Sequence, residues 1–167
     1  LLQFLSVKGN QDLRGYLPEF HSSSPLRILR LAHTSFFGKL PDSIGNLPSL
    51  YELDIIFCNF SGLIPTSIGN LTTLNNLDLS INNFFGQIPF SLANLTQLSQ
   101  LDLSYNSFSP QTLSWLGKQT KLTLLNLGQT NSYGDIPASL KNLTQLTILR
   151  LNRNQLTGQI PSWLVNH

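Results

Sequence analysis

The sequence predicts an α/β repeat solenoid of about seven 24-residue units, with a parallel concave β-sheet and short (3-10 or α) helical turns on the convex side. The main observation is a Leu-x-x-Leu-x-Leu pattern that recurs every 24 residues. It begins at Leu2, Leu26, Leu50, Leu74, Leu98, Leu122 and Leu146. The second observation is composition, because 35 of the 167 residues are Leu and 16 are Asn. Such a bias indicates a repeated structural unit rather than an ordinary globular core.

The composition also excludes several classes of protein. Hydrophobic residues make up 41% of the chain, which is too much for a disordered segment. The formal net charge is only +2 and no basic cluster occurs, so no nucleic-acid partner is expected. No stretch of the sequence reaches the roughly 20 apolar residues of a membrane-spanning helix. We therefore expect one continuous solenoid over residues 1–167, without a domain boundary.

Each unit begins with a strand. In Leu77-Asp78-Leu79 the apolar residues alternate with a polar one, which is the period-two pattern of a half-buried strand. One strand per unit, always in the same direction, predicts a parallel sheet. A single unit cannot bury its apolar side alone, so stability depends on contacts between neighbouring units.

An asparagine position follows the strand, where the chain turns and leaves backbone groups unpaired. A side-chain amide can both donate and accept there, which predicts a ladder of hydrogen bonds between turns. The ladder residues are Asn10, Asn82, Asn106 and Asn154. Thr34, Cys58 and Thr130 hold the same position in other units and are expected to make fewer hydrogen bonds. The single Cys58 is interpreted as a buried structural thiol.

A glycine and an apolar-Pro pair follow, which predict a bend, an extended segment and a helical turn led by Pro. The glycines are Gly38, Gly62, Gly86, Gly134 and Gly158. The fifth unit departs from this pattern: Pro110, Thr112 and Leu113 replace Gly, Ile and Pro, and Gln119 replaces a buried Leu. We expect an irregular outer face there.

Together these residues give Leu-x-x-Leu-x-Leu-x-x-Asn-x-Leu-x-Gly-x-Ile-Pro-x-x-Leu-x-x-Leu, which resembles the plant-specific class of extracellular leucine-rich repeats. The Gly-x-Ile-Pro element is specific to that class, and the resemblance covers essentially the whole chain. The class includes receptor-like proteins of disease resistance, receptor-like kinases and polygalacturonase-inhibiting proteins. Segments such as Ser-Leu-Ala-Asn-Leu-Thr at 91–96 are most similar to receptor-like proteins.

The resemblance implies a non-catalytic recognition module that lies in the apoplast or in a plasma-membrane ectodomain. It implies a peptide or protein ligand and a possible co-receptor with leucine-rich repeats, with membrane attachment only through other parts of a parent chain. The chain resembles an internal fragment without caps. Two alternatives stay open: a secreted inhibitor of a cell-wall hydrolase or another surface-binding protein such as an ice binder, and a structural spacer within a longer ectodomain.

Ligand binding is expected on the concave sheet, where outward residues form columns. The central column contains Asp54, Asp78 and Asp102 between Arg30 and Arg150, a charge pattern suited to a basic ligand, although Leu-Asp-Leu is also simple repeat consensus. A neighbouring column carries Phe57, Ile81, Tyr105 and Arg153, and with Ile56 it predicts an exposed apolar patch beside the acids. Scattered apolar residues on a solvent face are the alternative interpretation.

Four Asn-x-Ser/Thr sequons occur, at Asn59, Asn70, Asn94 and Asn142. If the chain is secreted, these are glycan acceptors, and we expect the sugars to mark the convex side. The alternative is that Asn-Leu-Thr is repeat consensus only.

No enzyme activity, metal or cofactor is expected. His21, His33 and His167 fall at unrelated places in the repeat, without a nucleophile at a shared site. The aspartate column lacks the enclosing loop that gathers six or more oxygen ligands around calcium.

Overall fold

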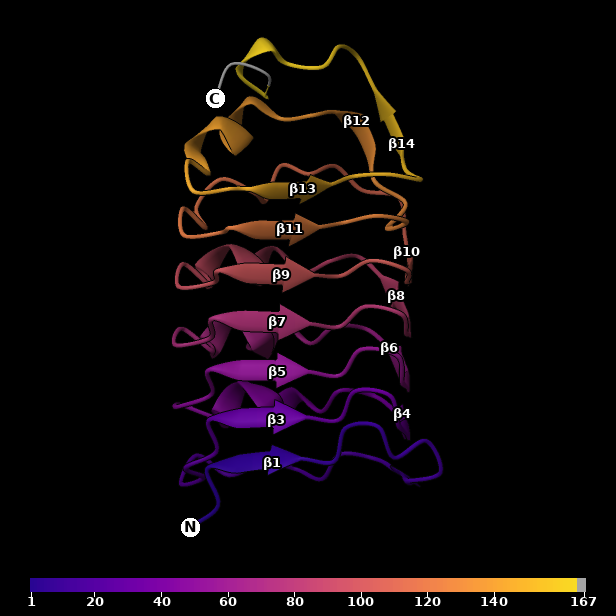
Figure 1. The fold of residues 1–167 in the computed structure, drawn as a ribbon, viewed down its shortest axis with the longest axis vertical. Coiled ribbons are helices and arrows are strands. Elements are labelled where there is room, and N and C mark those ends of the chain that lie inside the picture. The colour runs from indigo at the N-terminus through magenta and orange to yellow at the C-terminus, as the bar shows by residue number, and fades with distance from the viewer. Residues whose placement is uncertain (165–167) are drawn as a thin grey trace.

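The computed structural model describes residues 1–164 and is a solenoid of stacked repeats (Figure 1). The repeats rise from the N-terminus at one end to the C-terminal repeat at the other, and each strand lies directly above the preceding one. The predicted repeat architecture is therefore confirmed. His167, one of the three histidines considered above, lies outside the described residues.

Across residues 1–164 one strand per repeat forms a seven-stranded parallel sheet, with neighbours in chain order. Its strands are β1 (Phe4–Ser6), β3 (Ile28–Arg30), β5 (Glu52–Asp54), β7 (Asn76–Asp78), β9 (Gln100–Asp102), β11 (Leu124–Asn126) and β13 (Ile148–Arg150). The register advances by 24 residues per strand, so that Leu53 pairs with Leu77 and Asp54 with Asp78. Residues at one repeat position consequently form straight columns across the sheet, as predicted.

A second, lateral sheet was not predicted. In the described part of the chain five further strands pair in parallel at one edge of the solenoid, and two more form a separate pair (Figure 1). The five are β2 (Arg14–Gly15), β4 (Ser35–Gly38), β6 (Asn59–Gly62), β8 (Asn83–Gly86) and β10 (Ser107–Phe108), and the pair is β12 (Tyr133–Asp135) and β14 (Gln155–Thr157). The extended segment that the sequence predicted follows the bend glycine, whereas β4, β6 and β8 precede this glycine and end on it. All of these strands are too short for a period-two pattern to stand out.

Short 3-10 helices follow the lateral strands. Those of residues 1–164 are η1 (Asp42–Asn46), η2 (Thr66–Asn70), η3 (Phe90–Asn94), η4 (Ala138–Asn142) and η5 (Ser162–Leu164). The first four each follow a Pro with φ near −70°, as predicted, and close on a Leu backbone N–H. No helix within residues 1–164 combines the length and apolar character needed to cross a bilayer.

The core is a continuous apolar column between the sheets and the helical turns. The inward strand leucines Leu53, Leu77 and Leu101 are fully buried. Phe60 and Phe84 from adjacent lateral strands stack with parallel rings, 6.5 Å between centroids. Neighbouring repeats thus complete one another's core, which is the predicted source of stability.

The asparagine ladder is confirmed for Asn82, Asn106 and Asn154, whereas the exposed Asn10 donates only to the Val7 carbonyl of its own unit, at 2.7 Å. The Nδ2 group of Asn82 donates to the carbonyls of Ile55, Leu79 and Ser80, and its Oδ1 accepts from the Phe60 amide. At the same position the Thr34 hydroxyl donates to the Leu31 carbonyl at 2.6 Å and lies 3.5 Å from the Cys58 sulfur. These substituted turns therefore make fewer hydrogen bonds, and Cys58 is buried, as expected.

The fifth unit is irregular, as expected. Between β10 and β11 the described chain has no helical turn, whereas the second, third, fourth, sixth and seventh units each carry one. Trp115 and Leu116 fill the core in its place. The buried Gln119 donates from Nε2 to the Leu92 carbonyl at 3.1 Å, and its Oε1 accepts from the Gly117 amide. A polar side chain is accommodated here because both ends of its amide find partners.

Candidate functional site

Three aspartates stack on the concave sheet at the predicted positions. Asp54, Asp78 and Asp102 occupy paired register positions on β5, β7 and β9. The Oδ1 atom of Asp78 accepts from the Ser80 amide at 3.0 Å and from its hydroxyl at 2.6 Å, and Asp102 accepts in the same way from Ser104. These bonds fix each carboxylate against the end of its own strand.

The charged flanks of this column differ from the prediction. Arg30 does not face the aspartates alone: its Nε and Nη2 donate to the two oxygens of Glu52 at 2.6 and 2.8 Å. This hydrogen bond raises the pKa of the Arg30 guanidinium above its usual range. Lys8 lies 3.7 Å from Asp54 instead, and Asp54 is buried rather than exposed. Two of the predicted ligand contacts, Arg30 and Asp54, are therefore already paired within the protein.

At the other end of the column, Arg150 is exposed on β13. Asn126 lies between it and the acids, and its Nδ2 donates to Asp102 Oδ2 at 2.7 Å. The Asp102 carboxylate thus accepts a hydrogen bond from an uncharged amide and, among the described residues, is not paired with an arginine.

Asp78, the middle acid, has an altered protonation equilibrium. Burial raises its pKa to about 6, the hydrogen bonds from Ser80 oppose this, and the charges of Asp102 and Asp54 add to it. Its carboxylate therefore titrates in the mildly acidic range.

The next column is held in a left-handed backbone conformation. His33, Phe57, Ile81, Tyr105, Gln129 and Arg153 all have φ between 52° and 57°. Such values are uncommon outside glycine and are genuine outliers for a β-branched residue such as Ile81. Backbone hydrogen bonds to the next repeat hold them, as from the Ile81 amide to the Ser104 carbonyl at 2.9 Å. This conformation, which the sequence did not reveal, turns the side chains outward at the ends of the concave strands.

The predicted apolar patch exists along this column. Phe57 is 52% exposed, Ile81 39% and Tyr105 40%, whereas Ile56 is partly buried. The Arg153 guanidinium lies 5.9 Å from the centre of the Tyr105 ring, within cation–π range. The column thus presents rigidly held apolar and aromatic groups beside the three acids, the composition of an interaction surface.

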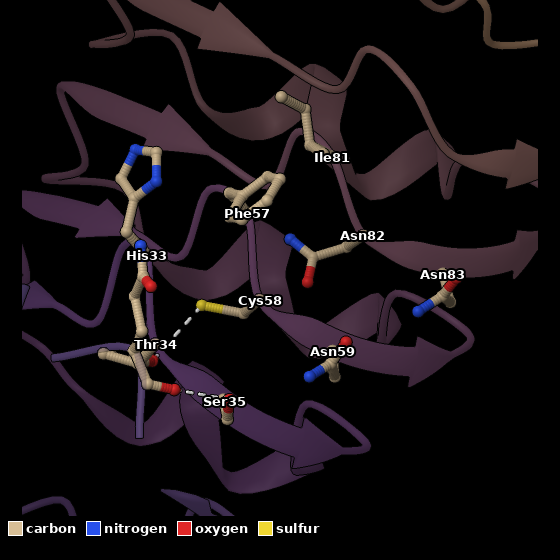
Figure 2. Close-up of a pocket in the computed structure, with 10 residues that line it drawn as sticks. His33, Thr34, Ser35, Phe57, Cys58, Asn59, Ile81, Asn82 and Asn83 are labelled. Carbon is tan, nitrogen blue, oxygen red and sulfur yellow. Dashed lines mark hydrogen bonds between the residues drawn. The ribbon is translucent and has the colours of Figure 1, made fainter. Parts of the chain in front are cut away.

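An open groove of about 510 Å³ runs beside the N-terminal half of this column (Figure 2). It lies where concave strands end and lateral strands begin, with Phe57 and Ile81 on one side and amide and hydroxyl side chains on the other. The lining residues are Gln11, His33, Thr34, Ser35, Phe57, Cys58, Asn59, Ile81, Asn82 and Asn83. The His33 and Phe57 rings lie 5.3 Å apart at its rim.

The four sequons do not share one face. Asn70, Asn94 and Asn142 are the last residues of η2, η3 and η4, exposed on the convex side as expected. Asn59 is different, because it begins the lateral strand β6 and lines the groove. The expectation that all four mark the convex side is therefore wrong for Asn59, since the lateral sheet was not foreseen.

No group of three or more His, Cys, Asp or Glu side chains suited to a metal ion occurs within residues 1–164. The concave face presents carboxylates, aromatic rings, aliphatic side chains and arginines. The sequence did not indicate one charged residue of this face, Glu52. Its only signal was its place two residues before Asp54, on the same face of the strand.

Comparison with known proteins agrees with this geometry. Residues 1–166 match a family model described as a leucine-rich repeat region. A 41-residue segment is 49% identical to Receptor-like protein 7 of Arabidopsis thaliana. The segment makes up 25% of this chain and 4% of that protein.

Two solved structures are similar over nearly the whole chain. The Arabidopsis receptor kinase HAESA, in complex with the peptide hormone IDA and the co-receptor SERK1, has a TM-score of 0.92 and 42% identity over 97% of this chain and 28% of its own. The ectodomain of the Arabidopsis thaliana membrane receptor kinase GASSHO1/SCHENGEN3, in complex with CASPARIAN STRIP INTEGRITY FACTOR 2, has a TM-score of 0.90 and 32% identity over 99% of this chain and 20% of its own. The chain thus spans less than a third of each relative, and their ectodomain nature supports the expected extracellular location.

Proposed function

Because the chain belongs to the leucine-rich repeat family, we propose that it is a non-catalytic, ligand- or partner-binding segment of a plant receptor-like ectodomain. Its role is recognition of an extracellular peptide or protein in defence or developmental signalling. The other parts of such a receptor would supply membrane attachment and signal output.

One observation carries this proposal: the column of Phe57, Ile81 and Tyr105, exposed and fixed at positive φ beside the three acids. Fixing bulky side chains in this backbone region costs on the order of 1–3 kcal/mol per residue, a kind of strain that concentrates at functional sites. Rigid aromatic and aliphatic groups lose little entropy on binding, so they are suited to anchoring a ligand.

The relatives support the class of ligand. HAESA was crystallised with a peptide hormone and a co-receptor, and RGFR1, 30% identical over 98% of this chain, with RGF2. By analogy we propose a peptide or small protein as the ligand, with Asp78 and Asp102 facing its basic groups and Arg150 and Arg153 facing its acidic groups. A second leucine-rich repeat protein is proposed as co-receptor.

We further propose that Asn70, Asn94 and Asn142 carry N-linked glycans. The three positions repeat at the ends of successive helical turns on the convex side. Glycans there would leave the concave face as the accessible side for partners.

A photo-cross-linking experiment tests the binding face. The photoreactive residue p-benzoylphenylalanine replaces Tyr105 on the concave face or Phe90, the exposed first residue of η3, on the convex side of the secreted protein. The protein is then incubated with apoplastic fluid from plant tissue. We expect a peptide or protein adduct at position 105 and none at position 90. An adduct at 90 alone, or equal labelling at both positions, would overturn the proposal.

A further inference from the structure

The groove beside Phe57 contains a sequon within its own wall. Asn59-Phe60-Ser61 lies at the start of β6, and Asn59 is exposed while Phe60 points into the core. Among residues 1–164 the structure gives the Asn59 carboxamide no hydrogen-bond partner, unlike Asn82 beside it, whose carboxamide forms four. The Asn59 amide is therefore free to act as a glycan acceptor.

Asn59 opens directly into the groove. Figure 2 shows its side chain on the wall that also carries Cys58 and Ser35, with Phe57 further along the same cavity. The volume of about 510 Å³ falls in the roughly 300–1,000 Å³ range typical of sites for small ligands. A sugar attached to Asn59 begins inside this space rather than at an open surface.

The lining of the groove fits a sugar residue. A hexosamine has an apolar face of C–H groups and a rim of hydroxyl and amide groups. The exposed Phe57 ring offers an apolar face, with the His33 ring beside it at a tilt of 32°. Gln11 and Asn83 offer amides that both donate and accept. The convex sequons lack such surroundings, since Asn70, Asn94 and Asn142 end helical turns exposed to solvent.

We propose that Asn59 carries an N-linked glycan whose first sugars lie in the groove against Phe57, so that this glycan covers the N-terminal end of the candidate binding column. Ligand contacts are thereby confined to the Tyr105 and Arg153 end, because Ile81 also lines the groove. The inference rests on the proposed extracellular function only in that the chain must pass through the secretory pathway.

The test uses the protein secreted from plant cells treated to retain high-mannose glycans. Glycopeptide mass spectrometry measures occupancy at each sequon, and an endoglycosidase applied to the native protein measures the release rate at each site. We expect a glycan at Asn59, and we expect its release to be at least about tenfold slower than release of the glycan at Asn70. A tenfold factor corresponds to ~1.4 kcal/mol of free energy that keeps the glycan in the groove. After denaturation the two rates should be equal.

Two variants distinguish protection of the glycan by the groove from general steric hindrance of the endoglycosidase. Phe57→Ala should bring the native release rate at Asn59 close to that at Asn70. Phe85→Ala is the matched control, because Phe85 has the same 52% exposure but lies on the lateral strand β8 outside the groove; it should leave the protection unchanged.

The outcomes distinguish the two proposals. An unoccupied Asn59 with occupied Asn70, Asn94 and Asn142 overturns this inference and leaves the extracellular function standing. Occupancy at none of the four sites overturns this inference together with the convex glycans proposed above. Equal native release at Asn59 and Asn70, or protection that survives Phe57→Ala, shows that the sugar does not lie in the groove.

Discussion

The Asn82 side chain accepts a hydrogen bond from the backbone amide of Phe60, 22 residues earlier, at 3.0 Å. The same carboxamide donates to the Ile55 carbonyl of that earlier repeat at 2.8 Å. One side chain thus satisfies buried backbone groups on both sides of a turn, and the bonds tie two repeats together.

Replacing Asn82 by Ala should destabilise the protein by about 3 kcal/mol or more, because several buried backbone groups lose their partners at once. The matched change Thr34→Ala removes one hydrogen bond to a backbone carbonyl, that of Leu31, and the weak contact with the Cys58 sulfur. It should cost about 1 kcal/mol. Urea unfolding followed by circular dichroism measures both, and equal losses for the two variants would contradict the ladder account.

Leu77→Ala should cost about 2–5 kcal/mol, since this side chain is fully buried between two repeats. Leu149 holds the same position in a repeat where it is only partly buried, so Leu149→Ala should cost distinctly less. Thermal unfolding of the pair would reveal this order. A larger loss for Leu149→Ala would mean that the two ends, not the centre, determine cooperativity.

Gly69→Ala should destabilise by about 1–3 kcal/mol through overpacking. A Cβ atom at Gly69 would lie 2.6 Å from both the carbonyl oxygen and the Cβ of Ser91 in the next helical turn. Ala93, at the same repeat position, is tolerated because the fifth unit has no regular helical turn above it. A Gly69→Ala melting temperature equal to that of the parent would show that the turns can separate freely.

Asp78 gives a pH-dependent prediction. Its folded pKa of about 6 is raised above the usual value for an aspartate, so the folded state binds the proton more tightly than the unfolded state does. Stability from this group is present below about pH 4 and is lost as the pH rises through about 6. Relative to Asp78→Asn, the parent should therefore lose about 3 kcal/mol across that window, since each pKa unit corresponds to about 1.4 kcal/mol. Denaturant unfolding at a series of pH values gives this difference, and parallel curves for the two proteins would refute it.

The sequence predicted the repeat, the parallel concave sheet, the asparagine ladder and the irregular fifth unit because each depends on a pattern of residue types. It did not predict the lateral sheet, whose short strands, such as Ser35–Gly38, have no distinctive periodicity. The left-handed conformation of Phe57 and Ile81 was equally hidden, since neither residue type favours it. These features depend on hydrogen bonds between repeats.

For the candidate site, the sequence placed the side chains in the right columns but not their partners. Arg30 was expected to face a ligand and instead binds Glu52, and Asp54 is paired with Lys8. Such pairing depends on how far each side chain extends toward the neighbouring strand. The repeat positions read from the sequence do not contain that information. The location of Asn59 in a groove, rather than on the convex side, follows from the unforeseen lateral sheet.

The central claim is tested most directly by the affinity of the ligand recovered by cross-linking at position 105. Calorimetry measures its dissociation constant for the parent, for Tyr105→Ala and for Tyr133→Ala. The two tyrosines are similarly exposed, at 40% and 44%, but Tyr133 lies on the lateral strand β12. The concave-face account predicts affinity at least about tenfold weaker for Tyr105→Ala, as at an interface anchor, with parent affinity for Tyr133→Ala and melting temperatures within a degree or two for both. Parent affinity for Tyr105→Ala would contradict it.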